Sequence, residues 1–165
     1  MTGSVRISAR VIVVDDLDCV LLVRALDKLD SKPAFWITPG GALEEDESLS
    51  EAAARELREE TGLATVPDQL GRPLALSRGK WIYRGTPSQS EDWYFGLRTQ
   101  RLMPITDGYT ELEADVLGTW HWWTPEELAS QAEIVIPKNL PKVVSMILQK
   151  THVGNGPVIL PWTSV

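Results

Sequence analysis

The sequence has little of what disulfide-rich, membrane-spanning or nucleic-acid-binding proteins require. Its 165 residues include one cysteine, Cys19, so no internal disulfide can form and a reducing compartment is favoured. No apolar run approaches the roughly 20 residues of a membrane helix, and the first residues lack the layout of a signal peptide. Acidic residues outnumber basic ones by 23 to 16, which argues against binding a nucleic-acid duplex or an anionic membrane. We therefore expect a cytoplasmic protein with neither among its partners.

Familiar catalytic signatures are absent as well. The chain contains no G-x-G-x-x-G, G-x-x-x-x-G-K-[ST], H-E-x-x-H or G-x-S-x-G pattern. His121 and His152 lack the spacing of metal ligands, so we interpret both as surface or hydrogen-bonded residues. There is no internal repeat and no linker-like segment. With 43% hydrophobic and 24% charged residues the composition is globular, and the length favours a single domain over residues 1–165.

Apolar and alternating segments predict strands separated by turns. The candidates are residues 5–14, 19–23, 35–37, 74–76, 81–83, 93–97 and 116–123. The run 11–14 is apolar at every position, as expected for a strand at the centre of a sheet, and Cys19 is expected to be an inert core thiol. Pro39-Gly40-Gly41 predicts a tight turn that stops the third strand. The residues after Gly154 carry no pattern that predicts an element.

Three segments have the features of helices. In the first, Ser48 and Glu51 have the spacing of a capping box, and Gly62 can end the helix in the left-handed conformation. Thr124 followed by proline begins a second helix, and residues 141–150 predict a third. Strands mixed with helices indicate an α/β fold in which helices cover a mixed sheet.

The first predicted helix carries a concentration of acidic side chains. Residues 41–63 hold eight acidic side chains and two arginines. At about 100° per residue, Glu56, Glu59 and Glu60 share one flank, where their charges repel one another. Arg55 can pair with only part of that charge, so the flank is either a solvated acidic face or a site for divalent cations. A carbonyl of the preceding glycine-containing turn would add an uncharged oxygen ligand.

The spacing of these residues is highly specific. Gly41, five residues, Glu47, seven residues and then the segment 55–63 match all nine specified positions of G-x5-E-x7-R-E-U-x-E-E-x-G-U, where U is a bulky aliphatic residue. Chance would produce this match with a probability on the order of 10⁻⁷ or less. The chain therefore resembles the Nudix hydrolase family. Residues 35–41 and 122–128 are also similar to family segments, so the resemblance covers roughly residues 4–150.

This resemblance implies both a fold and a chemistry. The family fold is an α/β/α sandwich around a mixed sheet. Its members hydrolyse a pyrophosphate bond in a nucleoside diphosphate linked to another moiety, by attack of a metal-activated water. The implied cofactor is Mg²⁺, with Mn²⁺ as a substitute, and the implied partner is a small nucleotide substrate; a homodimer is compatible with the family. The matching metal-ligand positions are Glu56, Glu59, Glu60 and the Gly40 carbonyl, with Arg55 orienting the carboxylates and Glu47 supporting the metal site.

The resemblance constrains the general base and the substrate contacts less closely. Family members often place one glutamate outside the box, where Glu113 and Glu111 are the candidates here, and Glu59 is the next candidate if neither serves. A group of basic and aromatic residues could hold a phosphate and stack a base, or could form an amphipathic hairpin with one solvated face. These substrate-binding candidates are Arg78, Lys80, Trp81, Tyr83 and Arg84.

Two alternatives stay open at the level of sequence. One is a non-catalytic module of the same fold that binds nucleotides or proteins; such modules lose one or more box glutamates, all of which are present here. The other concerns the substrate. The proline and tyrosine that mark ADP-ribose and dinucleoside polyphosphate hydrolases would fall at Ser77 and Gly79, so neither subgroup is indicated. Nucleoside triphosphates and nucleotide sugars are both candidates.

Overall fold

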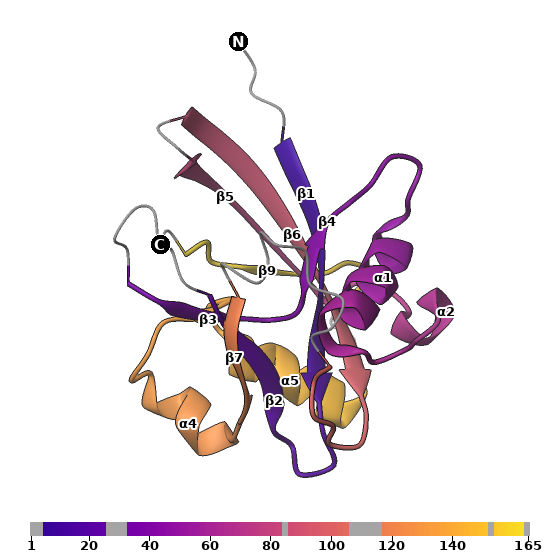
Figure 1. Ribbon diagram of the computed structural model, residues 1–165, viewed down its shortest axis with the longest axis vertical. Coiled ribbons are helices and arrows are strands. Elements are labelled where there is room, and N and C mark those ends of the chain that lie inside the picture. The colour runs from indigo at the N-terminus through magenta and orange to yellow at the C-terminus, as the bar shows by residue number, and fades with distance from the viewer. Residues whose placement is uncertain (1–4, 26–32, 84–85, 106–116, 152–153, 164–165) are drawn as a thin grey trace.

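The computed structural model describes residues 5–25, 33–83, 86–105, 117–151 and 154–163 (Figure 1). Its strands are β1 (Val5–Val14), β2 (Val20–Ala25), β3 (Phe35–Ile37), β4 (Gly40–Ala42), β5 (Ala75–Tyr83), β6 (Thr86–Arg98), β7 (Leu117–Trp123), β8 (Val135–Ile136) and β9 (Val158–Leu160). Its helices are α1 (Leu49–Thr61), α2 (Pro67–Leu70), α4 (Pro125–Ser130) and α5 (Leu140–Gln149). The strands form a mixed sheet of order β8-β3-β2-β1-β6-β5-β9, in which β4 also pairs with β1 and β7 with β2. No helix in these ranges is long and apolar enough to cross a membrane.

Strand β1 lies at the centre of the sheet and packs on both of its faces. It runs parallel to β6 over its whole length and antiparallel to β4 and β2. The odd-numbered residues of the run 11–14 pack in one core cluster with Leu57 of α1, and the even-numbered ones pack in a second cluster with Val143 of α5. Successive side chains of a strand point to opposite faces, so a run that is apolar at every position is buried only where both faces are covered.

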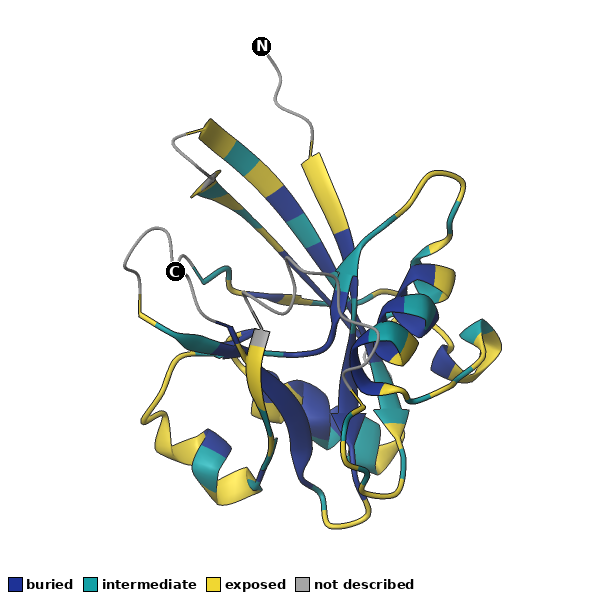
Figure 2. Ribbon diagram, viewed as in Figure 1, coloured by how far each residue is buried: buried dark blue, intermediate teal, exposed yellow. Residues whose placement is uncertain are grey.

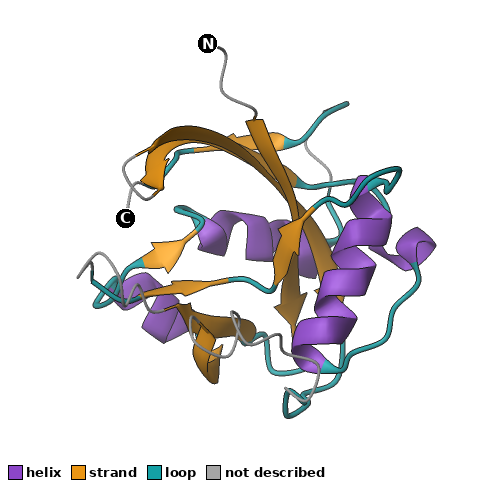
Figure 3. Cartoon of the chain, turned by 45° about the horizontal axis from the view of Figure 1, so that its top comes forward, coloured by secondary structure: helices purple, strands orange, loops and turns teal. Residues whose placement is uncertain are grey.

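Helices α1 and α5 therefore cover opposite faces of the sheet, with strands between them (Figures 1 and 3). Buried residues concentrate in the central strands and on the inward faces of these two helices, whereas the far ends of β5 and β6 and most of α4 are exposed (Figure 2). The predicted α/β/α sandwich around a mixed sheet is confirmed.

The structure corrects the turn that was expected at residues 39–41. Gly40–Ala42 form strand β4, which pairs antiparallel with Ser8–Arg10 of β1. A Cβ atom on Gly40 would lie 2.3 Å from Ala9 O, and Gly40 has a φ of 136°, so only glycine allows the two backbones to approach this closely. Glycine here permits strand pairing, and it brings the residues that precede α1 onto the central strand.

The edge of the sheet also differs from the sequence prediction. The two short strands expected at 74–76 and 81–83 belong to one strand, β5, which forms an antiparallel hairpin with β6. The segment after Gly154, for which no element was predicted, supplies β9, which pairs parallel with β5. A three-residue strand has no periodicity of its own to detect, because its backbone hydrogen bonds come from a partner distant in the sequence.

Candidate functional site

Helix α1 begins and ends where the sequence predicts. Ser48 Oγ accepts a hydrogen bond from Glu51 N at 3.3 Å, and Glu51 Oε2 accepts one from Ser48 N at 2.8 Å, which completes the capping box. Gly62 ends the helix in the left-handed conformation with a φ of 76°. The apolar face of α1, which includes Ala53 and Leu57, packs on the sheet, and the helix lies alongside β4 (Figure 1).

Arg55 connects α1 to the segment that precedes it. Its Nε and Nη2 atoms donate to the two carboxylate oxygens of Glu47, each at 2.9 Å. Its Nη1 atom donates to Glu56 Oε1 at 2.9 Å and to Glu59 Oε2 at 3.2 Å. Nη2 also donates to Ala42 O of β4 at 3.1 Å. Arg55 thus contacts Glu56 and Glu59 of the acidic flank, together with Glu47 before the helix, which agrees with the expectation that it pairs with only part of the flank.

These contacts shift the ionisation of both partners. Hydrogen bonding to Glu47 is the main cause that raises the pKa of Arg55; burial opposes it, and the hydrogen bond to Glu56 adds to it. The same hydrogen bonds from Arg55 lower the pKa of Glu47 below its ordinary value. Both side chains are largely removed from water, with 19% of Arg55 and 13% of Glu47 exposed. The pair is therefore charged and fixed at neutral pH.

The glycines before α1 approach the other carboxylates. Glu60 Oε2 accepts a hydrogen bond from Gly40 N at 2.8 Å. A Cβ atom on Gly41 would lie 2.5 Å from Glu56 Oε1, so the absence of a side chain at Gly41 leaves room for that carboxylate. Glu56 and Glu60 are buried, 8% and 5% exposed, although both belong to the acidic flank. Ionised groups are retained at such sites only where polar partners replace water.

The structure thus brings the predicted box residues together, although not as a finished cation cage. Among the described residues, no three acidic, histidine or cysteine side chains are arranged to hold a metal ion. Instead, Arg55 donates hydrogen bonds to Glu56 and Glu59, and Gly40 N donates one to Glu60. Glu59 is the most open of the three predicted ligands, with 42% of its side chain exposed. Three carboxylates and a neighbouring backbone carbonyl are nevertheless an all-oxygen donor set, which is the kind that hard divalent cations prefer.

Arg10 of β1 lies beside the box, and the sequence reasoning missed it. Its Nη1 atom donates to Thr38 O at 3.1 Å and to Gly40 O at 3.2 Å, and its Nε atom lies 3.7 Å from Asp92 Oδ1. Burial by itself would lower the pKa of Arg10, but Asp92 and, to a smaller extent, Glu60 hold it above the ordinary value. The available signal was an arginine inside an otherwise apolar stretch of strand, between Ala9 and Val11.

The described substrate-binding candidates, Arg78, Lys80 and Trp81, do not lie on one face of their strand. Arg78 and Lys80 alternate with Trp81 along β5, so the basic and aromatic side chains leave opposite faces of the strand. Arg78 and Lys80 are exposed, and Arg78 Nε donates to Glu91 Oε1 of β6 at 2.8 Å. Tyr83 ends β5, and its side chain is outside the described part of the structure, as is Arg84.

The candidates for general base, Glu111 and Glu113, also lie outside the described residues.

Of the two histidines, His121 is exposed, and its Nε2 atom lies 3.1 Å from Glu127 Oε1 in an ordinary surface contact. His152 is outside the described ranges. Cys19 is 4% exposed, and burial together with the nearby Asp15 carboxylate raises its pKa, as expected for an inert core thiol.

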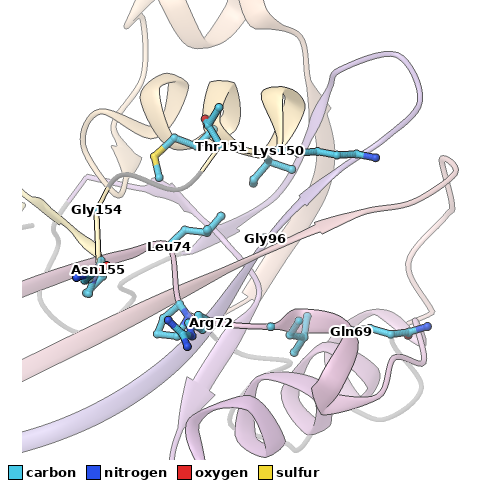
Figure 4. Close-up of a pocket in the computed structure, with 15 residues that line it drawn as sticks. Gln69, Arg72, Leu74, Gly96, Lys150, Thr151, Gly154 and Asn155 are labelled. Carbon is cyan, nitrogen blue, oxygen red and sulfur yellow. The ribbon is translucent and has the colours of Figure 1, made fainter.

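An open cavity of about 870 Å³ lies between α2, the start of β5 and the C-terminal end of α5. Its lining includes the apolar side chains of Leu74, Met146 and Ile147 and the exposed basic side chains of Arg72 and Lys150. In Figure 4 the Lys150 side chain extends away from Gly154 and Asn155. None of the predicted site residues lines this cavity, so it is separate from the box.

Comparison with known proteins relates this geometry to a family. The NUDIX domain model matches residues 5–143. Phosphatase NudJ of Escherichia coli (strain K12) is 56% identical over 106 residues, which cover 63% of this chain and 61% of that protein. The m7GpppN-mRNA hydrolase NUDT17 of Danio rerio is 49% identical over 51 residues, which cover 31% of this chain and 17% of that protein. The chain spans less than two thirds of the length of the curated relatives it matches.

A solved structure supports the same relationship at the level of the fold. The MutT protein from Methanosarcina mazei Go1 has a TM-score of 0.58 and 18% sequence identity, over 91% of this chain and 97% of that chain. The family model covers most of the sequence, and the residues that it matches include the whole box, from Gly41 through α1 to Leu63. The chain therefore belongs to the NUDIX domain family.

Proposed function

We propose that this protein is a metal-dependent hydrolase that cleaves a pyrophosphate bond in a nucleoside diphosphate linked to another moiety, such as a nucleoside triphosphate or a nucleotide sugar. The observation that carries the proposal is the assembly around α1: Glu60 and Glu56 lie beside the Gly40 and Gly41 backbone, and Arg55 donates hydrogen bonds to both Glu56 and Glu59. Relatives named as a phosphatase and as an mRNA hydrolase support the same class of reaction.

The residues present fit a divalent cation. Glu56, Glu59, Glu60 and the Gly40 carbonyl would hold Mg²⁺, or Mn²⁺ in its place, since all of these donors are oxygens. The missing side chain at Gly41 is part of the fit, because a Cβ atom there would fill the space that the Glu56 carboxylate uses. When bound, the cation would reverse the local charge for a polyanionic substrate, acidify a water molecule and stabilise charge on phosphoryl oxygens.

The protein side chains would divide the remaining work. Glu47 holds Arg55 through two hydrogen bonds, and Arg55 in turn fixes an oxygen each of Glu56 and Glu59, so the carboxylates keep their places when substrate arrives. Glu113 and then Glu111 are proposed as the general base. Glu59, whose side chain is 42% exposed, is the next candidate if neither serves. Trp81, Tyr83, Arg78, Lys80 and Arg84 are proposed as substrate contacts.

The test is a nucleotide panel with identification of the products. Purified protein with Mg²⁺ would be incubated with nucleoside triphosphates, nucleotide sugars, ADP-ribose and dinucleoside polyphosphates. Glu59→Gln and Glu60→Gln should each lower kcat at least about 100-fold, because each removes a charged oxygen from the site. Glu126→Gln changes an exposed glutamate at the start of α4 and is the matched control.

Two results would contradict the proposal. Full turnover in both box variants would show that the metal assignment is wrong. Tight nucleotide binding by the wild-type protein, without any cleavage across the panel, would instead support the non-catalytic binding module.

A further inference from the structure

Arg10 is a buried cation on the central strand, directly opposite the proposed backbone ligand. In the antiparallel pairing of β1 with β4, Arg10 is the register partner of Gly40. Only 13% of the Arg10 side chain is exposed. Removing a guanidinium from water is costly unless polar groups replace its hydration. The groups that Arg10 contacts therefore indicate its role.

Those contacts converge on one short segment. A single Nη1 atom donates to Thr38 O at 3.1 Å and to Gly40 O at 3.2 Å, so it bridges the two carbonyls on either side of Pro39. From the opposite direction, Gly40 N donates to Glu60 Oε2 at 2.8 Å. Gly40 is thus held through its carbonyl by Arg10 and through its N–H by Glu60.

Gly40 needs this support because it has no side chain to anchor it. Its φ of 136° lies in a region open mainly to glycine, and glycine carries the largest backbone freedom of any residue. A carbonyl oxygen has two lone pairs, so the hydrogen bond from Arg10 leaves one available to a cation. We propose that Arg10 is a positioning residue for the metal site, which holds the Gly40 carbonyl in the orientation needed for metal binding.

This inference rests on the proposed function, and it predicts whether removing Arg10 strengthens or weakens metal binding. A positive charge close to the site disfavours a cation, so a purely electrostatic role predicts that removing Arg10 tightens metal binding. A positioning role predicts the opposite, because the carbonyl ligand loses its orientation. Loss of a residue that orients a metal ligand typically weakens affinity about 10- to 100-fold.

The experiment measures Mn²⁺ affinity by electron paramagnetic resonance, in the whole protein and without substrate. Arg10→Met should bind Mn²⁺ at least about 10-fold more weakly than wild type, and Arg10→Lys, which keeps a charged donor, should recover part of the loss. Two controls should keep wild-type affinity. Arg98→Met removes an arginine that pairs with Asp18 at 2.7 Å, and Ile12→Val shortens a β1 side chain that packs in the core under α5.

Wild-type or tighter Mn²⁺ binding by folded Arg10→Met would overturn the inference, and so would a lysine variant that binds no better than the methionine variant. If Arg10→Met does not fold, Arg10→Gln takes its place, because a shorter neutral amide cannot span both carbonyls; wild-type affinity there would equally overturn it. Glu60→Gln separates this inference from the proposed function. If Glu60→Gln also keeps wild-type affinity, the metal assignment itself fails, whereas a loss in Glu60→Gln alone contradicts only the role of Arg10.

Discussion

Arg55 organises the box through the geometry of one side chain. A guanidinium presents its donors in a fixed plane. Arg55 can therefore hold Glu47 with two hydrogen bonds, from Nε and Nη2, and still donate to Glu56 and Glu59 from Nη1. A lysine has a single charged centre and could not make this set of contacts at once. The carboxylates that would otherwise repel one another are therefore held close together before any cation binds.

The Glu47–Arg55 pair should make the stability of the metal-free protein depend on pH. Because the pKa of Glu47 is lower in the folded protein than its ordinary value of 4.5, its stabilisation is present above that value and is lost as the pH falls through the folded pKa. In urea denaturation with EDTA, Glu47→Gln should lower the free energy of unfolding by about 1–3 kcal/mol at pH 7. The difference from wild type should shrink as the pH is lowered below 4.5 and through the folded pKa of Glu47.

Glu45→Gln serves as the control, because Glu45 is exposed and should show no difference from wild type at any of these pH values. A Glu47→Gln variant that is equally stable at pH 7, or a difference that grows on acidification, would contradict the assignment of this pair.

A side chain at Gly41 should weaken metal binding. In Gly41→Ala the added methyl group would meet Glu56 Oε1 at 2.5 Å, so the carboxylate must move away from its present position. We expect Mn²⁺ affinity to fall by about 10-fold or more. Gly156→Ala is the control, because a Cβ atom there meets nothing within 4 Å and Gly156 has no positive φ. Unchanged Mn²⁺ affinity in Gly41→Ala would show that Glu56 can bind from another position.

Helix α1 is the element whose limits are set by its own sequence. Its capping box satisfies backbone N–H groups that have no partner inside the helix. Ser48→Ala should therefore lower the free energy of unfolding by about 1 kcal/mol, whereas Ser48→Asp keeps an acceptor and should remain close to wild type. Thermal and urea denaturation would measure both. Equal losses in the two variants would show that the hydroxyl is not acting as a cap.

Local sequence predicts some elements better than others. An element is predictable when its backbone hydrogen bonds form between residues that are close in the sequence. The hydrogen bonds of α1 and its caps lie within residues 48–62, so the sequence predicts where the helix starts and ends. Gly40–Ala42 form a strand only because Ser8–Arg10 lie alongside, and β9 depends in the same way on β5. Two adjacent glycines predict a turn unless the partner strand is known.

The protein as a whole has two cores that share the central strands β1, β2 and β6. The core under α1 contains Leu57, the core under α5 contains Leu140, and β1 contributes alternate residues to both. Leu57→Ala and Leu140→Ala should each lower the free energy of unfolding by about 2–5 kcal/mol. Because β1 contributes side chains to both cores, disrupting one core also destabilises the other. Both variants should therefore unfold in a single transition.

Circular dichroism and tryptophan fluorescence, followed in the same urea titration, would test this cooperativity. The two signals should give the same midpoint in the wild type and in both variants. Separate midpoints, or a variant in which only one signal shifts, would show that the two layers unfold independently and would contradict the expectation of a single domain.

Residue spacing over fewer than 25 positions predicted the acidic helix, its caps, the box residues and the apolar run 11–14, which requires a sheet covered on both faces. Which oxygen accepts from which donor depended instead on how the chain folds. Arg10 reaches the Gly40 carbonyl from a strand 30 positions away, and Glu60 reaches the Gly40 N–H across 20 positions. Such contacts follow from strand register and helix packing, and neither is written in the spacing of neighbouring residues.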